Sequence, residues 1–298
     1  MSSGSKVTML DDLILHEATH SQLAHFITKP SHALLLTGPT GIGKTAIAEA
    51  IAAAVLEIEP KKLASYPYLA IVRPDGNSIS IDAVRQLQKF LQLKTVGEKP
   101  FRRTIIIEYA HLLTIEAQNA FLKLLEEPPT DTVTILTASS PRALLPTILS
   151  RAQTIAITAP TEEQLKIMLD KSQKGDNAVK QAYFLSGGLP GLLHALLDGN
   201  EEHPLLASVA QAKAVLQKQP FERLAMLDTM SKQKESALGV VDALERIAQA
   251  GLTGASAKKD LVRIKQWHRV RKASLEARNQ LRSSANAKLV LSKLFLNM

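Results

Sequence analysis

An eight-residue segment, GPTGIGKT at residues 38–45, has the composition of a phosphate-binding loop. It matches the pattern G-x-x-x-x-G-K-[ST], in which glycines let backbone N–H groups turn toward phosphate oxygens and a following helix adds its positive end. Lys44 would reach the β and γ phosphates of a nucleotide, and the Thr45 hydroxyl would hold Mg²⁺. An incidental glycine-rich turn is the alternative. The pattern predicts a site for ATP or ADP with Mg²⁺ at Gly38, Pro39, Thr40, Gly41, Ile42, Gly43, Lys44, Thr45 and Ala46.

A single carboxylate, Glu108, ends the β-rich run TIIIE at residues 104–108. In nucleotide sites of this kind such a strand ends in an acid for the Mg²⁺ shell, and a second acid orients the attacking water. Glu108 can take the first role through a bound water. Tyr109 cannot take the second, because a phenol with a pKa of about 10 is a poor base at neutral pH. We therefore expect nucleotide binding with little hydrolysis, while a solvated strand end is the alternative for Glu108.

A second chemical pattern, HEATH at residues 16–20, matches H-E-x-x-H, which on a helix can place two imidazoles on one metal with Glu17 as a base. Leu23 stands where a longer zinc pattern has glycine, and His25 is at the wrong offset for a third ligand. We therefore predict a surface amphipathic helix and no zinc.

The elements that position these residues are readable between residues 33 and 157, where short apolar runs alternate with helical patterns. Runs that are apolar throughout are typical of strands covered on both faces of a parallel sheet. Asp82 is expected to cap a helix at residues 83–93, and Thr114 one at residues 115–127. The alternation predicts an α/β sheet with right-handed crossovers. Strands are predicted at residues 33–37, 69–73, 104–108, 133–138 and 154–157.

After Pro160 the sequence becomes helical. Thr161 and Gln164 form a capping-box pattern, SGGLPG at residues 186–191 interrupts the helices, and DGNEEHP at residues 198–204 is typical of a linker. These features predict three domains. They are an α/β nucleotide-binding domain at residues 1–160, a small helical domain at 161–200 and a helical C-terminal domain at 201–298.

Composition and charge limit the class of protein. The 298 residues include no cysteine, which excludes disulfides and thiolate metal sites, and no apolar run approaches the roughly 20 residues of a membrane helix. The N-terminus lacks the apolar region of a signal peptide, so we expect a cytoplasmic protein without membrane contact. Residues 251–298 contain eleven Lys and Arg against two acids, so they carry +9 against a formal net charge of +8 for the whole chain. That asymmetry indicates either a polyanion partner such as DNA or a solvated helical face.

Several segments carry a family resemblance. SHALLLTGPTGIGKT at residues 31–45, HLLTIEAQNAFLKLLEEPP at 111–129 and LLPTILSRAQTIAI at 144–157 resemble the bacterial clamp-loader branch of the AAA+ ATPases. PDGNSISIDAVRQLQ at residues 74–88, SGGLPGLLHAL at 186–196 and RSSANAKLVLSKLFL at 282–296 are also similar to sequences of this branch. The resemblance covers nearly the whole chain, and its Leu-Glu-Glu-Pro-Pro block is highly specific.

The resemblance implies a five-stranded AAA+ sheet, a three-helix lid at residues 161–200 and a helical collar at 201–298 that joins five subunits in a ring. Partners would be motor subunits of the gamma/tau type and a clamp opener of the delta type. Such a hetero-pentamer places the sliding clamp on primer-template DNA, so this chain would meet DNA and clamp through the complex. Ser150 and Arg151 match a Ser-Arg-Cys motif whose arginine acts on a neighbouring subunit's ATP, and Ala152 replaces the cysteine. The resemblance thus implies that Arg151 is an arginine finger in trans, and a structural salt bridge is the alternative.

Three departures from the family pattern bear on hydrolysis. Motor subunits carry Asp-Glu where this chain has Glu108 and Tyr109, and a lid arginine at or beside the position of Pro190. They usually carry a four-cysteine zinc module, which residues 59–68 lack. We therefore favour a non-hydrolysing clamp-loader subunit. A hydrolysing motor-type ATPase is the second interpretation, and a stand-alone DNA-binding AAA+ protein, suggested by the basic C-terminal segment, is the third.

Overall fold

The computed structural model describes residues 8–161, 163–166, 176–198, 204–232, 234–283 and 285–298. The chain forms two compact units, Met1–Leu165 and Lys166–Met298. The first is an α/β unit that ends close to the predicted boundary at residue 160. The second is helical, and its predicted division into a lid and a collar at residue 200 stays a prediction, because residues 199–203 lie outside the described part of the chain.

Five strands form one sheet in the first unit, which confirms the predicted α/β class. Their order across the sheet is β2-β3-β4-β1-β5, and every neighbouring pair is parallel. The three inner strands are buried along their whole length, which explains why they lack the alternation of half-exposed strands. The strands are β1 (Ala33–Thr37), β2 (Leu69–Val72), β3 (Arg103–Ile107), β4 (Thr132–Ala138) and β5 (Gln153–Ala156).

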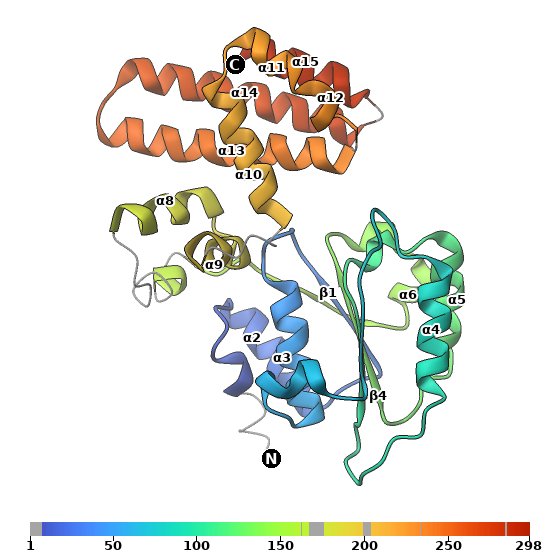
Figure 1. The fold of residues 1–298 in the computed structure, drawn as a ribbon. Helices are drawn as coiled ribbons and strands as arrows, with labels where there is room; N and C mark the ends of the chain where they lie inside the picture. Colours follow the sequence, from blue (N-terminus) through green and yellow to red (C-terminus); the bar gives the residue numbers. More distant parts are fainter. Residues whose placement is uncertain (1–7, 162, 167–175, 199–203, 233, 284) are drawn as a thin grey trace. The chain divides into compact units, whose positions relative to one another are not determined.

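Helices cover both faces of this sheet. Figure 1 shows α2 and α3 on one face and α4, α5 and α6 on the other. The helices are α2 (Glu17–Thr28), α3 (Lys44–Leu56), α4 (Ile81–Leu91), α5 (Ile115–Glu126) and α6 (Pro146–Leu149). Short 3-10 helices are η1 (Thr8–Leu10), η2 (Pro60–Ser65), η3 (Ala110–Leu112) and η4 (Pro141–Ala143).

The helix starts test the capping predictions. Thr114 caps α5 as predicted, because its side chain accepts a hydrogen bond from the Ala117 N–H at 3.2 Å. The prediction for Asp82 is wrong: Ser80 is the N-cap of α4, and Asp82 lies in the first turn, where it pairs with Arg85 at 2.9 Å. A carboxylate in that turn is favoured by the helix dipole as well, so the two roles look alike in sequence.

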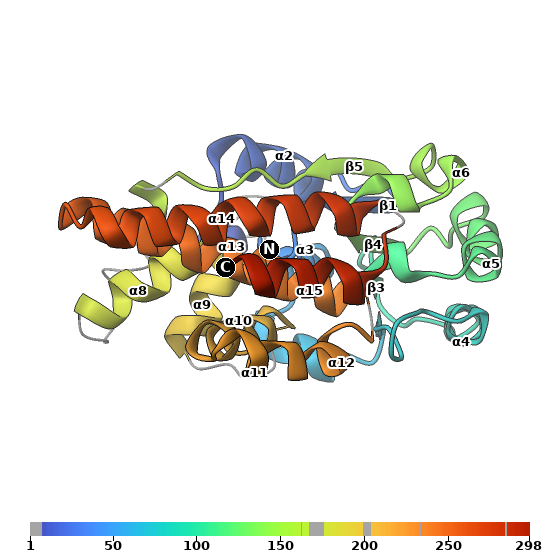
Figure 2. The same ribbon diagram turned by 90° about the horizontal axis from the view of Figure 1, so that it is seen from above.

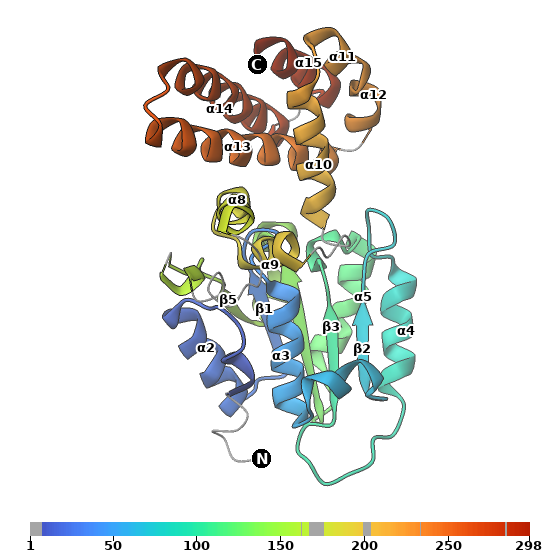
Figure 3. The ribbon, with the colours of Figure 1, turned by 60° about the vertical axis from the view of Figure 1, so that its left-hand side comes forward.

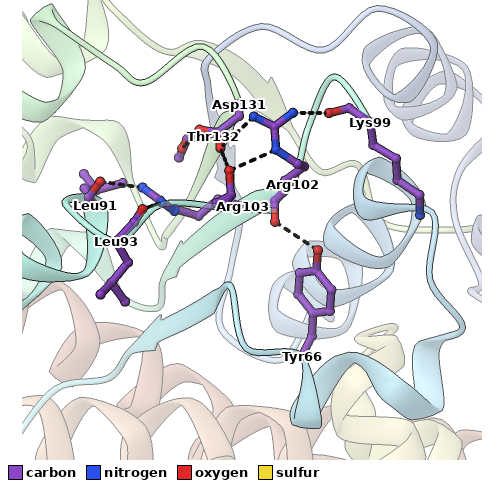
Figure 4. A network of polar contacts seen from close by, with 9 residues as sticks. Tyr66, Leu91, Leu93, Lys99, Arg102, Arg103, Asp131 and Thr132 are labelled. Atoms are coloured by element: carbon purple, nitrogen blue, oxygen red, sulfur yellow. Dashed lines mark hydrogen bonds and ion pairs between the residues drawn. The ribbon is translucent and has the colours of Figure 1, made fainter. Parts of the chain in front are cut away.

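The end of the sheet where β3 begins is held by two arginines (Figure 4). Arg103, the first residue of β3, is 2% exposed and donates hydrogen bonds to the carbonyls of Leu91, at 2.7 Å, and Leu93. Its guanidinium lies over the Phe90 ring, 5.3 Å from the centroid. Arg102 pairs with the carboxylate of Asp131 at 3.4 Å. This network ties the segment after α4 to the start of β3.

In its described residues the second unit consists of helices and the turns that join them. Figure 3 shows α13 and α14 as an antiparallel pair, and Figure 2 shows α15 alongside α14. No helix in the described part of the chain has the length and apolar character needed to cross a membrane. The helices are α8 (Asp176–Ser186), α9 (Pro190–Asp198), α10 (Pro204–Gln217), α11 (Pro220–Ala225), α12 (Leu227–Met230), α13 (Lys234–Ala257), α14 (Leu261–Arg282) and α15 (Ala287–Asn297).

The predicted helix start and helix break in the helical part are confirmed, and the predicted linker is not tested. Thr161 and Gln164 form the predicted capping box, with backbone-to-side-chain hydrogen bonds of 2.9 and 3.3 Å. The SGGLPG segment separates α8 from α9, and Gly187 has a φ of 59°, which glycine adopts without strain. The predicted linker at residues 198–204 falls mostly outside the described residues.

Candidate nucleotide site

The loop of residues 38–43 joins the carboxyl end of β1 to the first turn of α3. β1 lies between β4 and β5, so the loop emerges from within the sheet and not at its edge. Gly43 is the N-cap of α3 and supplies no side-chain cap, so no capping side chain competes for the N–H groups of the first turn. This is the strand-loop-helix context that a phosphate-binding loop requires.

Glycine is required at two positions of the loop for conformational reasons. Gly41 and Gly43 have φ values of 88° and 99°, a region that residues with a Cβ rarely adopt. A Cβ built on Gly43 would meet no atom within 4 Å, so space does not restrict that position. The glycines therefore set the backbone direction of the loop, which directs its N–H groups.

Lys44 is held at the loop by backbone carbonyls. Its side chain is 7% exposed, and Nζ donates hydrogen bonds to the carbonyl oxygens of Gly38, at 2.7 Å, and Pro39, at 3.0 Å. Burial lowers the pKa of Lys44 to about 8. A phosphate oxygen accepts a charge-assisted hydrogen bond that is stronger than one to a neutral carbonyl. The ammonium is thus positioned to exchange loop carbonyls for a bound phosphate.

Glu108 lies where the sequence places it, directly after β3, but its carboxylate has a protein partner. It is 5% exposed, and Oε1 pairs with Nε of Arg73, which follows β2, at 3.0 Å. Glu49 of α3 belongs to the same group, because burial and then the charge of Glu108 raise its pKa, while Arg73 opposes them. Glu49 is one helical turn after Thr45, so both lie on one face of α3. Sequence analysis missed Arg73 and Glu49, since the ion pair joins residues 35 positions apart.

Tyr109 occupies the position of the expected second acid in a left-handed backbone conformation, with φ of 53°. Its N–H donates to Oγ1 of Thr137 at 3.0 Å, which anchors the end of β3 to β4. Burial, followed by the charge of Glu108, raises the pKa of the Tyr109 phenol. The phenol therefore stays protonated at neutral pH and cannot serve as the base.

His111 is a titratable side chain at the site that the sequence did not single out. Its Nδ1 accepts a hydrogen bond from the Ser139 N–H at 3.4 Å. Burial and then the charge of Lys44 lower its pKa, which keeps the imidazole neutral at neutral pH. The effect of the Lys44 charge shows that His111 belongs to the nucleotide site. The sequence could not reveal this, because the two residues come together only in the folded chain.

Arg151 follows α6 and is bound within its own unit. Its Nη2 pairs with Oε1 of Glu126 at 3.0 Å, and Nη1 donates to the Thr147 carbonyl at 3.1 Å. The side chain remains 35% exposed. The neighbouring Ala152 is 8% exposed and packs in the core of the α/β unit. The structural ion pair considered as an alternative is therefore present in the free chain, and the arginine-finger role stays a prediction.

The HEATH residues have separate local partners. His16 is the N-cap of α2, with Nδ1 accepting from the Ala18 N–H at 3.2 Å. The Nε2 atom of His20 lies 3.3 Å from Oδ1 of Asp11. The same helix buries Leu23 and Phe26, as expected for an amphipathic helix. Pro190, at or beside the position of the family's lid arginine, is the first residue of α9.

Comparisons with known proteins identify the family. Residues 16–161 match the family described as DNA polymerase III, delta subunit. This segment belongs to the clamp-loader family of DNA polymerase III subunits. The family resemblance drawn from the sequence is thereby confirmed for residues 16–161.

Individual clamp-loader relatives match over part of their length. DNA polymerase III subunit delta' of Pseudomonas aeruginosa is 34% identical over 179 residues, which cover 54% of each chain. Subunit delta' of Bacillus subtilis is 35% identical over 138 residues, 42% of this chain and 41% of the relative. Subunit tau of Bacillus subtilis is 33% identical over 138 residues, 42% of this chain and 24% of the relative. The chain thus matches about half the length of the delta' relatives.

A solved structure extends the likeness of fold to both units. The DNA polymerase III gamma subunit-related protein of Thermotoga maritima aligns with a TM-score of 0.50 at 20% identity. The alignment covers 93% of this chain and 97% of that chain. The fold is therefore that of an α/β AAA+ domain followed by helices, as the sequence predicted.

Proposed function

We propose that this chain is a nucleotide-binding, non-hydrolysing subunit of a bacterial clamp loader, which works in the cytoplasm to place the sliding clamp on primer-template DNA. The observation that carries the proposal is the contrast within one site. The phosphate loop is complete, whereas Glu108 is paired with Arg73 and a protonated tyrosine stands in place of the water-orienting acid. Family membership supplies the biological context.

In this proposal ATP or ADP binds with its phosphates on the loop N–H groups and on Lys44. Among the described residues, no three His, Asp or Glu side chains are grouped to hold a metal ion by themselves. Mg²⁺ usually binds through one or two protein oxygens together with phosphates and waters. The Thr45 hydroxyl would supply such an oxygen, and Glu108 would contribute through a water if its free oxygen faces the ion. The bound nucleotide then acts as a structural ligand of the α/β unit.

The proposed partners are gamma/tau-type motor subunits and a delta-type clamp opener in a five-membered ring. Two exposed side chains of α15 support an assembly role: Leu289 is 71% and Leu296 is 60% exposed. They are seven residues apart on one helix face, whereas Leu291 and Leu294 are buried in the unit's core. Deleting residues 205–298 should abolish assembly with these partners in size-exclusion experiments.

The proposed contribution of Arg151 is catalysis in trans. Glu126, its partner, is 50% exposed, and ion pairs at this exposure contribute about 1 kcal/mol or less. The charge spreading over a neighbour's γ-phosphate is a stronger attraction for the guanidinium, so exchange of partners on ring assembly is energetically accessible. Arg151 would therefore act on the nucleotide of the next subunit and not on that of its own chain.

The test is a direct measurement of binding and turnover by the isolated, full-length chain. We expect saturable binding of Mg·ATP and Mg·ADP, with hydrolysis far below the roughly 1 s⁻¹ that is ordinary for slow enzymes. Mixed with motor and clamp-opening subunits, the chain should enter a ring with DNA-stimulated ATPase. Failure to assemble, or turnover near 1 s⁻¹ by the chain alone, would contradict the proposal.

A second candidate is a hydrolysing motor-type subunit, favoured by the match to subunit tau. In that case Glu49, whose pKa is raised and whose carboxylate lies near Glu108, would replace the missing acid. The two functions separate on one variant. Glu49→Gln should eliminate turnover in a motor-type subunit, whereas in a non-hydrolysing subunit there is no turnover to lose and nucleotide binding remains.

A further inference from the structure

Basic side chains on one flank of α14 serve the fold of the helical unit. Arg278 pairs through Nη1 with Asp242, at 3.8 Å, and Glu245, at 2.5 Å, both on α13. Burial raises the pKa of Asp242, while the positive charges of Arg246, Arg278 and then Arg282 oppose the increase. Arg278 is therefore engaged with acids of the neighbouring helix and is not available to a partner.

Three other cations of α14 lie on a different face. Lys265, Arg269 and Lys272 are exposed, and their spacing of four and three residues places them along one stripe of the helix. None of their side chains makes a hydrogen bond or ion pair with another residue in the described ranges. The excess charge after residue 250 thus includes cations paired with acids, such as Arg278, and unpaired ones, among them this stripe.

A groove of about 280 Å³ adjoins this stripe and is lined by residues of α14 and α15. Arg269 and Lys272 line it from α14, and Lys293 lines it from α15. Lys293 is exposed, and its side chain also has no partner among the described residues. The acid in this lining is Glu276, so the three lining cations and one carboxylate leave a charge of about +2, and with Lys265 the total is about +3.

We propose that Lys265, Arg269, Lys272 and Lys293, here called the basic stripe, bind the phosphate backbone of duplex DNA. Helix rise places Lys265 and Lys272 about 10 Å apart, which is close to three base-pair steps along a duplex. Among the described residues from 263 to 283, no large apolar side chain is exposed; the exposed ones nearby are Leu261 and Val262 at the start of α14 and Leu289 and Leu296 on α15. A protein partner or a lipid surface needs apolar anchors, whereas phosphates need only cations, so the surface around Lys265, Arg269 and Lys272 favours phosphates.

The choice of DNA among polyanions rests on the proposed function, and the binding itself rests on the stripe. Contact with phosphates alone reads no base sequence, so binding is weak, independent of sequence and steeply dependent on salt. With four contacts, log K should fall against log salt with a slope of about −3.6, which is roughly a 100-fold loss between 50 and 200 mM salt. The stripe would hold DNA near the loader without selecting a site.

The experiment is a salt titration of fluorescent duplex DNA with the full-length chain. The test variant is Lys265→Gln, Arg269→Gln and Lys272→Gln together, which keeps exposed helical positions helical. The matched control is Lys61→Gln, Lys89→Gln and Lys94→Gln, which removes the same charge from exposed positions of the α/β unit. The test variant should bind at least 10-fold more weakly at 50 mM salt with a slope near −1, and the control should stay within about threefold of the wild type.

A substitution of opposite sign adds a second criterion. Glu276→Gln removes the carboxylate from the groove and should tighten DNA binding by about twofold to fivefold. Thermal unfolding of all variants should match the wild type, because each site is exposed. Equal binding by the test variant and the wild type would overturn the proposal, as would equal losses in the test variant and the control.

Other ligands separate the remaining explanations. If polyglutamate or vesicles of anionic lipid bind as tightly as duplex and lose affinity equally in the test variant, the assignment to DNA is wrong. Tight, salt-resistant binding of DNA would also contradict phosphate binding by the basic stripe and would favour a stand-alone DNA-binding protein. Assembly distinguishes the two proposals: if the wild type binds DNA through the stripe yet fails to join motor and clamp-opening subunits, the proposed function fails and the stripe stands.

Discussion

Lys44 and Arg103 are both buried cations whose charges face backbone carbonyls, but they lie at opposite ends of the sheet. Lys44 stands after the carboxyl end of β1, and Arg103 is the first residue of β3. The ammonium of Lys44 has two carbonyl partners and a pKa lowered to about 8. The guanidinium of Arg103 has two carbonyls and the Phe90 ring, and arginine does not deprotonate in proteins.

The difference shows how one sheet uses buried charge for binding at one end and for structure at the other. An ammonium is a compact point charge whose carbonyl partners can be exchanged for phosphate oxygens. A planar guanidinium between fixed carbonyls orders the chain around it, here the segment after α4. The first cation should therefore matter for ligand affinity, and the second for stability.

The largest effect is expected for Arg103→Met. Removing the guanidinium leaves the buried carbonyls of Leu91 and Leu93 without their donors, so the free energy of unfolding should fall by about 3 to 5 kcal/mol. Urea unfolding of the isolated chain measures the loss. Arg85→Met, which removes an exposed ion pair, is the control and should change stability by about 0.5 kcal/mol or less. A loss below about 1 kcal/mol for Arg103→Met would contradict the role of Arg103 in stabilising the fold.

The next effect is a pH dependence of stability that belongs to Lys44. Its folded pKa of about 8 lies below the unfolded value of 10.5, so the unfolded chain binds more protons between these values. The free energy of unfolding should therefore rise with pH across this window, by about 3 kcal/mol relative to Lys44→Met. Below about pH 8 both states are protonated and the difference is constant.

Unfolding curves of the two proteins from pH 7 to 10.5 check this prediction. Burial raises the pKa of Tyr66 and of Tyr109, which lowers stability at high pH, but it does so in both proteins and cancels in the comparison. Parallel pH profiles for wild type and variant would show that Lys44 is not desolvated in the folded chain.

Loss of nucleotide affinity comes third. Lys44→Ala removes a charged donor to phosphate, so affinity for Mg·ATP should fall about 50-fold. Stability at neutral pH should change little, because relief of the buried charge offsets the two carbonyl hydrogen bonds that are lost. Calorimetric titration measures the first quantity and urea unfolding the second. Lys61→Ala, at an exposed position, should change neither. If Lys44→Ala destabilised the protein as strongly as Arg103→Met, the two cations would have the same role.

The smallest effect on stability is expected at a third, half-exposed cation. Arg151→Ala removes the pair with Glu126 and should cost about 1 kcal/mol or less. In the reconstituted ring the same variant should assemble normally but reduce DNA-stimulated ATPase and clamp loading, since arginine fingers contribute about 10³-fold or more in simple systems and less in a multi-site ring. Wild-type rates in a normally assembled ring would restrict Arg151 to its structural pair.

Prediction from sequence worked best where a signal is local. Each predicted strand has its counterpart in the sheet, because uninterrupted apolar runs have few other stable places. The start of α4 was misplaced, because Ser80 and Asp82 are both suited to a helix start and only the backbone distinguishes them. The sequence could not predict which C-terminal cations are paired and which are unpaired, because pairing depends on which face of α14 packs on α13.

The phosphate loop, the order of strands and helices along the chain and the family could be predicted from the sequence, because each depends on residues that are contiguous along the chain. Which charged side chains are paired and which are free depends on the packing of elements that are distant in sequence. Glu108 finds Arg73 on a neighbouring strand end, and Arg151 finds Glu126 at the end of α5. Both pairs join residues at least 25 positions apart. A carboxylate or guanidinium is the same side chain whether paired or free, and only the elements packed beside it determine what it can bind.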